Sequence, residues 1–93
     1  MKLRVIYTAQ LRAAVQRKEE DIELPAGSPL STLLSHLAER HVSGRAHLVD
    51  KEGRAHASLL VVINEFATSA RDARSVSLND GDVVLLLPPI AGG

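Results

Sequence analysis

The sequence predicts an α+β fold in which a mixed sheet of four or five strands carries one main helix across one face. Three observations predict it: an alternating strand pattern at the start, a helical stripe of apolar residues in the middle, and two β-branched runs in the second half. With 93 residues the chain has room for one small module. We expect a single domain over residues 1–87 and an extended tail over residues 88–93.

The first two strands are predicted to be antiparallel neighbours. Leu3, Val5 and Tyr7 alternate with their neighbours along Lys2–Tyr7, which is typical of a half-buried strand. A second extended stretch over residues 20–24 stops at Pro-Ala-Gly, a turn sequence. Residues 8–19 are then most simply the connection of a hairpin, with a long or irregular loop.

A helix is predicted to follow Ser28. This serine supplies a capping oxygen. Pro29 is tolerated in a first helical turn, because the amide hydrogen that it lacks has no hydrogen-bond partner within the helix there. Apolar positions then recur at i, i+3, i+4, i+7, i+8 and i+11, which gives one face to cover a sheet, and Gly44 is the predicted stop. The members of this stripe are Leu30, Leu33, Leu34, Leu37, Ala38 and His41.

The second half is predicted to complete the sheet. Residues 43–58 are a polar connection with a short helical turn around residues 46–49, whereas residues 59–63 and Val83–Leu87 are β-branched or aliphatic runs typical of strands. A short edge element is expected within residues 66–78. This order of elements is that of a ubiquitin-like β-grasp, in which the last strand lies parallel beside the first.

Composition excludes several classes of function. Eleven lysines and arginines balance eleven aspartates and glutamates, and one tyrosine, one phenylalanine and no tryptophan provide no stacking platform, so we expect no nucleic-acid partner. The absence of cysteine excludes disulfides and a thiolate nucleophile. The apolar runs are far shorter than the roughly 20 residues that span a bilayer, and the first residues show no signal-peptide pattern. We therefore expect no membrane partner and a cytoplasmic protein.

The C-terminal segment is the candidate functional site. Two consecutive prolines cannot continue a sheet and favour an extended, stiff conformation at the start of the tail, whose six residues could reach about 20 Å. Glycine lacks a Cβ, so a Gly-Gly end passes through a narrow channel and allows another protein to close on it. We predict a flexible tail whose reactive group is the α-carboxylate of Gly93.

Three segments give the chain a family resemblance. Residues 5–12 (Val-Ile-Tyr-Thr-Ala-Gln-Leu-Arg), 79–83 (Asn-Asp-Gly-Asp-Val) and 88–93 (Pro-Pro-Ile-Ala-Gly-Gly) resemble the MoaD/ThiS family of ubiquitin-like sulfur carriers over nearly the whole chain. The resemblance implies that an adenylating enzyme of the MoeB/ThiF type uses ATP and magnesium to activate Gly93. Sulfur from a donor then gives a thiocarboxylate, which serves a biosynthetic enzyme. The chain itself is then a carrier, not an enzyme, and binds no cofactor.

The acceptor and two rival functions stay open. The tail favours the small subunit of molybdopterin synthase, with its large subunit as partner, whereas the polar insertion over residues 43–58 resembles longer carriers of cysteine biosynthesis, and thiamine-type pathways are also open. One rival is a protein modifier joined to lysines through Gly93. The other is a noncovalent β-grasp binding module whose glycine tail is incidental.

A docking face is predicted beside the tail. The last strand is apolar on both faces, although one helix covers only one side of the sheet, so an exposed apolar patch remains unless a loop covers it. Arg12 either pairs with an acidic group of a partner or is a solvated surface arginine. The residues predicted to contact a partner are Gly92, Ala91, Ile90, Pro89, Pro88, Leu87, Leu85, Ile6 and Arg12.

Other polar clusters receive structural interpretations. We predict no metal site, because His36 and His41 lie off a common helix face and the remaining histidines lie in a polar loop. The acidic run over residues 19–23 is interpreted as a solvated strand flank, not an acidic docking face. Asp80 and Asp82 are interpreted as turn formers, not a catalytic pair.

Overall fold

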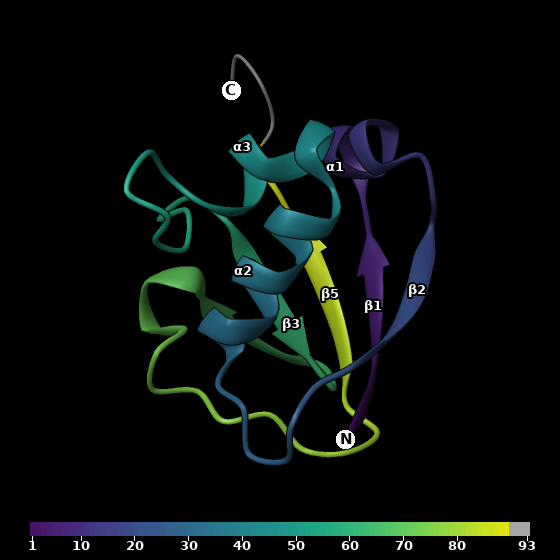
Figure 1. Cartoon of the computed structure of the whole chain (residues 1–93), viewed down its shortest axis with the longest axis vertical. Helices are drawn as coiled ribbons and strands as arrows, with labels where there is room; N and C mark the ends of the chain where they lie inside the picture. The colour runs from purple at the N-terminus through teal and green to yellow at the C-terminus, as the bar shows by residue number, and fades with distance from the viewer. Residues whose placement is uncertain (90–93) are drawn as a thin grey trace.

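The computed structural model describes residues 1–89 and shows a five-stranded mixed sheet with helices on one face (Figure 1). The strands lie in the order β2-β1-β5-β3-β4. They are β1 (Lys2–Tyr7), β2 (Glu19–Glu23), β3 (Leu60–Ile63), β4 (Phe66–Ser69) and β5 (Val83–Leu87). The helices are α1 (Ala9–Val15), α2 (Leu30–Arg40) and α3 (Arg45–Leu48), with 3-10 turns η1 (Val42–Gly44) and η2 (Ala70–Asp72). This is the ubiquitin-like β-grasp that the sequence predicts.

Strand β5 is the central strand. It runs parallel to β1, where Val5 pairs with Val84, and antiparallel to β3, where Val61 pairs with Leu86. The predicted parallel pairing of the last strand with the first is confirmed. Because Pro88 and Pro89 follow at once, β5 ends at Leu87 and the chain leaves the middle of the sheet, not one of its edges.

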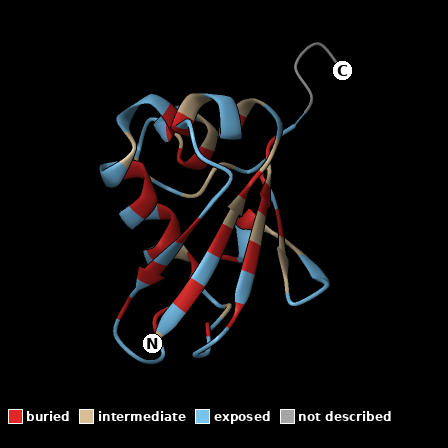
Figure 2. Cartoon of the chain, turned by 90° about the vertical axis from the view of Figure 1, so that its right-hand side faces the viewer, coloured by how far each residue is buried: buried red, intermediate tan, exposed pale blue. Residues whose placement is uncertain are grey.

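The core lies between the sheet and the helices. Side chains of β1 and β5 alternate between buried and more exposed positions, as Figure 2 shows along the strands. Helix α2 covers the buried face with the predicted apolar stripe, all of which is buried apart from half-buried His41, which lies one residue beyond the helix. The fully buried members of this core include Leu3, Val5, Leu33, Leu34, Leu37, Val84 and Leu86.

The prediction of a long loop over residues 8–19 is wrong, because α1 forms there. Leu11 and Val15 are four residues apart, face the core and are both buried. The helix ends at Val15, and the cap residue Gln16 adopts a left-handed conformation (φ 63°) and donates its N–H to the Arg12 carbonyl at 2.8 Å. Two turns offer too few apolar positions for a periodic pattern, so the stabilisation comes from tertiary packing.

The predicted limits of α2 are also corrected. Ser28 does not cap the helix, because its hydroxyl donates to the Pro25 carbonyl at 2.6 Å. The free N–H of Leu30 donates instead to the Val76 carbonyl at 2.8 Å, so a distant segment replaces the local cap. The helix ends at Arg40, and Gly44 lies in the next turn, where a Cβ would approach Val15 Cγ2 to 3.0 Å.

The connection after α2 is more ordered than its composition indicates. The helical turn predicted around residues 46–49 is present as α3, shifted by one residue, and a bridge between Val49 and Ala55 closes the following loop. Strand β4 is the predicted edge element. The described part of the chain contains no helix long and apolar enough to cross a membrane.

The acidic turn before β5 has the predicted structural role. Gly81 takes a left-handed backbone (φ 87°), which favours glycine. The buried Asp82 carboxylate accepts hydrogen bonds from the Asn79 N–H at 2.8 Å and from Asn64 Nδ2 at 2.7 Å. Asp80 accepts from the N–H of Lys2 at 2.6 Å. Both carboxylates are therefore engaged in fixing the turn.

Candidate functional site

The site is built around the C-terminal end of β5, where the chain enters the proline pair. Pro88 is buried and Pro89 is exposed, so the exit from the sheet lies between them. The Thr8 hydroxyl donates to the Leu86 carbonyl at 2.9 Å, and the Gln10 side-chain amide donates to the Pro89 carbonyl. The start of α1 therefore holds the chain in place from Leu86 to Pro89.

Thr8 and Gln10 are contacts that the sequence analysis missed. The signal was present, because both residues lie in segment 5–12, which carries the family resemblance together with segments 79–83 and 88–93. No pattern within either segment shows that the two touch. The parallel pairing of β1 with β5 brings them together, since parallel neighbours end at the same edge of a sheet.

The face of the sheet opposite α2 carries the apolar side chains predicted to dock a partner. Ile6, Leu85 and Val62 are register neighbours across β1, β5 and β3, and Leu87 pairs with Leu60 one step nearer the exit. Leu60 retains 44% of its accessible surface. We call Ile6, Leu60, Val62, Val83, Leu85 and Leu87 the outer apolar face.

The outer apolar face is continuous with the exit of the chain. Leu87 is both its last member and the last residue of β5, directly before Pro88. Ile6, Leu85 and Leu87 are half-buried, and Val83 keeps 38% of its surface. The structure thus brings together the predicted residues Ile6, Leu85 and Leu87 beside the exit; a surface of this kind is typical of a protein interface.

Arg12 lies at the same end of the sheet. Its guanidinium is exposed, and Nε donates to the Tyr7 carbonyl at 3.0 Å, so the head group is anchored to the end of β1. No acidic side chain within residues 1–89 pairs with it. The predicted pairing of Arg12 with a partner stays a prediction. The predictions for Gly93, Gly92, Ala91 and Ile90 lie outside the described residues.

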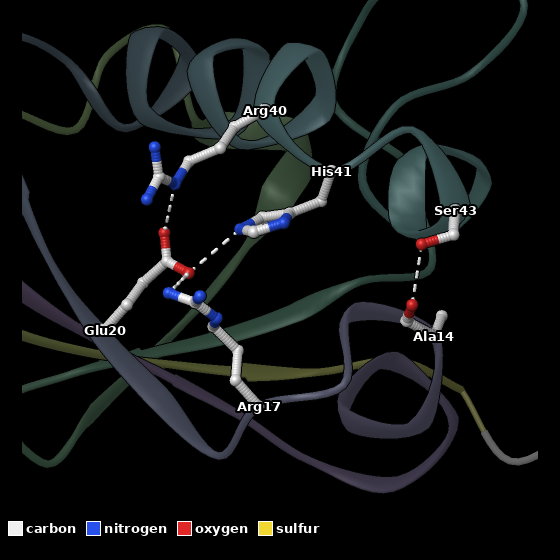
Figure 3. A network of polar contacts seen from close by, with 6 residues as sticks. All are labelled: Ala14, Arg17, Glu20, Arg40, His41 and Ser43. Atoms are coloured by element: carbon white, nitrogen blue, oxygen red, sulfur yellow. Dashed lines mark hydrogen bonds and ion pairs between the residues drawn. The ribbon is translucent and has the colours of Figure 1, made fainter.

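A buried polar network joins β2 to the end of α2 (Figure 3). Glu20, only 8% exposed, accepts from Arg40 Nε at 2.8 Å and Arg17 Nη1 at 3.0 Å, and its Oε2 lies 2.9 Å from His41 Nε2. The His41 ring in turn meets the Tyr7 ring edge to face, with centroids 5.9 Å apart. The interpretation of residues 19–23 as a solvated flank is therefore wrong for Glu20.

The electrostatics of this network favour a charged Glu20. Burial alone would raise the pKa of its carboxyl, but hydrogen bonds and charges from His41 and Arg40 outweigh burial and hold that pKa below its usual range. Burial, and then the negative charge of Glu20, raises the pKa of Tyr7. The network is a structural clamp with its charges satisfied, and His41 is engaged by a single carboxylate. Among residues 1–89, no three histidines, aspartates or glutamates gather as metal ligands.

The fold and the exit geometry define the class of protein, a ubiquitin-like β-grasp whose last strand sits in the middle of the sheet. A family model described as ThiS family matches residues 5–93. The chain therefore belongs to the ThiS family. No curated protein matches it.

Solved structures extend the comparison. A putative molybdopterin converting factor, subunit 1, from Pyrococcus furiosus is 29% identical, with 97% of this chain and 99% of that chain covered and a TM-score of 0.75. SAMP1 from Haloferax volcanii is 18% identical over 100% of both chains, with a TM-score of 0.86. The BexX/CysO complex from Amycolatopsis orientalis contains a chain that is 24% identical, with 98% and 99% covered and a TM-score of 0.68. The fold is thus shared with a putative molybdopterin converting factor subunit, with SAMP1 and with a chain of the BexX/CysO complex.

Proposed function

We propose that this protein is a sulfur carrier whose Gly93 carboxylate is converted to a thiocarboxylate. The observation that carries the proposal is the exit of the chain from the centre of the sheet, directly beside the outer apolar face. The match to the ThiS family model, which extends through residue 93, supports it. A partner seated on that face would receive the C-terminal segment without any rearrangement of the core. The protein acts as a cosubstrate in the cytoplasm and supplies no catalytic residue.

The chemistry belongs to the partners. In an activating enzyme of the MoeB/ThiF type, a Gly93 carboxylate oxygen attacks the α-phosphorus of magnesium-bound ATP and releases pyrophosphate. The resulting mixed anhydride has AMP as a good leaving group, which a free carboxylate lacks. Sulfide supplied by a donor attacks the acyl carbon, the bond to AMP breaks, AMP leaves, and a thiocarboxylate remains on Gly93. An acceptor enzyme takes the sulfur, and water restores the carboxylate.

The acceptor we favour is the large subunit of a molybdopterin synthase. The support is the 29% identity with a putative molybdopterin converting factor subunit over nearly the full length of both chains. Cysteine or thiamine-type pathways have weaker support, because the likeness to the CysO complex is an agreement of fold. The two assignments separate when the thiocarboxylate form is offered to each acceptor enzyme and sulfur transfer is measured.

A second candidate is a protein modifier joined to lysines through Gly93. The observation in its favour is the fold of SAMP1, a small archaeal modifier protein, which covers the whole of this chain. Both functions need the same activated carboxylate, so they differ only in the group that attacks it. Lysine-linked conjugates on a blot, lost on deletion of Gly93, would support the modifier.

The activation step is tested by ATP–pyrophosphate exchange with a candidate activating enzyme. We expect exchange with the unmodified protein and none after deletion of Gly93 or addition of residues beyond it. The control is Lys18→Ala, which changes an exposed side chain and should leave exchange unchanged. Normal exchange by the Gly93-deleted protein would contradict the proposed mechanism.

A further inference from the structure

A second surface feature lies on the helix side of the sheet, away from the outer apolar face. It is a groove of about 380 Å³ between the first turns of α2, the loop around residues 50–55 and the segment 70–74. Arg54, Arg71 and Arg74 supply its cationic groups, while Ser31 and Ser35 contribute two hydroxyls from α2. Its apolar lining comes from Ala55, Ala70 and Ala73.

The walls of this arginine groove are held by backbone hydrogen bonds. The Ser31 N–H donates to the Ala73 carbonyl at 3.0 Å, which ties the segment of Arg71 and Arg74 to α2. On the other side, the Asp50 N–H donates to the Arg54 carbonyl at 2.7 Å and the Arg54 N–H donates to Asp50 Oδ1 at 3.0 Å. The groove is therefore built before any ligand arrives, which lowers the entropic cost of binding.

The lining of the groove carries more positive than negative charge, and among its arginines only Arg54 contacts a carboxylate within residues 1–89. Within residues 1–89, Arg71 and Arg74 form no ion pair, and Arg54 is 72% exposed with carboxylate contacts of only 3.8 Å to Asp50 and 3.7 Å to Glu52. Asp50, the one acidic residue of the lining, already accepts the N–H groups of Glu52 and Arg54. Since the whole chain has no formal net charge, this local excess of positive charge is a property of the groove.

We propose that the arginine groove binds an acidic segment of a partner protein. Guanidinium groups pair carboxylates with two parallel N–H···O bonds, and Arg71 and Arg74 are free to do so. The methylene groups of glutamate would lie over the alanine side chains, and the Ser31 and Ser35 hydroxyls, which make no hydrogen bond to residues 1–89, would donate to further carboxylates. No residue that lines the groove is aromatic, so stacked bases of a nucleic acid have nothing to bind.

The position of the groove allows one partner to contact both the groove and the exit of the chain at the end of β5. Ser69 pairs with Leu60 and Leu60 pairs with Leu87, so two strand spacings, about 10 Å, separate the end of β4 from the exit of the chain. Arg71 follows Ser69 by two residues. The identity of the partner as the enzyme that receives the C-terminal segment rests on the proposed function. The binding of an acidic segment to the groove does not depend on that function.

The test is an NMR titration of the ¹⁵N-labelled full chain with a hexaglutamate peptide at low ionic strength. We expect saturable chemical-shift changes of the Ser31, Ser35 and Arg71 amides. These changes should disappear in about 0.5 M salt, because the shorter Debye length screens ion pairs between exposed groups. The double variant Arg71→Ala/Arg74→Ala should bind roughly tenfold more weakly. The control Arg45→Ala removes a charge outside the groove and should change affinity less than about twofold, because Arg45 is exposed on α3 and forms no ion pair within residues 1–89.

Three outcomes would overturn the proposal. The first is the absence of saturable shifts, and the second is equal weakening of peptide binding by Arg45→Ala and by the double variant. The third is binding of inorganic phosphate at the same amides with the same affinity as the peptide, which would assign the groove to small anions. The spectrum of the free double variant shows whether it is folded, and Arg71→Lys/Arg74→Lys keeps the charge but loses the planar fork. No activating enzyme is present, so the result is independent of the chemistry at Gly93.

Discussion

The two faces of the sheet have similar apolar residues but different neighbours. On the inner face, Val84 and Leu86 of β5 are fully buried beneath the helices. On the outer face, Val83, Leu85 and Leu87 of the same strand stay partly exposed, and within residues 1–89 no helix covers them. One strand thus contributes both to the core and to the surface beside the exit of the chain.

This difference assigns the stability of the fold to the inner face and the binding of a partner to the outer face. Substitutions on the inner face remove contacts that hold the fold, whereas substitutions on the outer face remove area that only a partner would bury. If the protein is a carrier, as proposed above, this division leaves the outer apolar face available to a partner in the free state.

The largest effect is expected for Leu86→Ala. Leu86 is fully buried at the centre of the sheet, so its truncation leaves a cavity and should lower the free energy of unfolding by about 2–5 kcal/mol. Urea unfolding followed by circular dichroism measures the change. A loss below about 1 kcal/mol would show that the inner face relaxes around the cavity and that burial there does not dominate the stability of the fold.

A smaller loss is expected for Glu20→Gln, which tests the polar part of the inner face. Removing the carboxylate leaves Arg40 and His41 without their anion and should cost about 1–3 kcal/mol at pH 7. The folded-state pKa of Glu20 is lowered, so its contribution is present above the ordinary glutamate pKa and is lost as the pH falls through the folded-state value.

The sign of that pH dependence supplies the check. The stability difference between the original protein and Glu20→Gln should be greatest near neutral pH and should shrink below about pH 4.3. Unfolding curves measured at several pH values give this difference. A difference that grows on acidification would contradict the clamp, and Glu23→Gln, an exposed position on the same strand, is the matched control.

Gly44→Ala should lower the free energy of unfolding by at most about 1–3 kcal/mol, and by less if the side chains of α1 move to make room. The added Cβ would meet Val15 Cγ2 at 3.0 Å and Leu11 Cδ1 at 3.1 Å, so both side chains have to shift. Thermal unfolding measures the loss. A variant as stable as the original would show that α1 packs loosely against the turn after α2.

The smallest effect on stability is expected on the outer apolar face. Leu60→Ser should change the free energy of unfolding by less than about 1 kcal/mol, because Leu60 is 44% exposed. If the face docks the activating enzyme, the same variant should raise KM in the exchange reaction roughly tenfold, as loss of a central apolar contact does. Ser58→Ala, an exposed change just before β3, is the control. An unchanged KM would exclude Leu60 from the interface.

Local patterns predict most of the fold, and tertiary contacts account for the errors. The order of strands and the stripe of α2 follow from periodicity, and the β-grasp topology follows from that order. Helix α1 was missed because Leu11 and Val15 are its only buried residues. The cap of α2 was misassigned because the acceptor of the Leu30 N–H, Val76, lies far along the sequence.

The site shows the same division. Ile6, Leu85 and Leu87 were predictable because strand alternation assigns them to one face. Thr8 and Gln10 were not, since their partners lie 78 and 79 residues away and only the parallel pairing of β1 with β5 brings them close. Glu20 and the arginine groove were also missed, because burial and convergence of charges arise from segments that no local pattern connects.

The most direct test of the central claim is the intact mass of the protein after incubation with an activating enzyme, ATP, magnesium and a sulfide source. The proposed function predicts a mass change that matches replacement of one oxygen by sulfur, and fragmentation should place it on Gly93. An unchanged mass with several activating enzymes that are each active on their own carriers would contradict the assignment as a sulfur carrier.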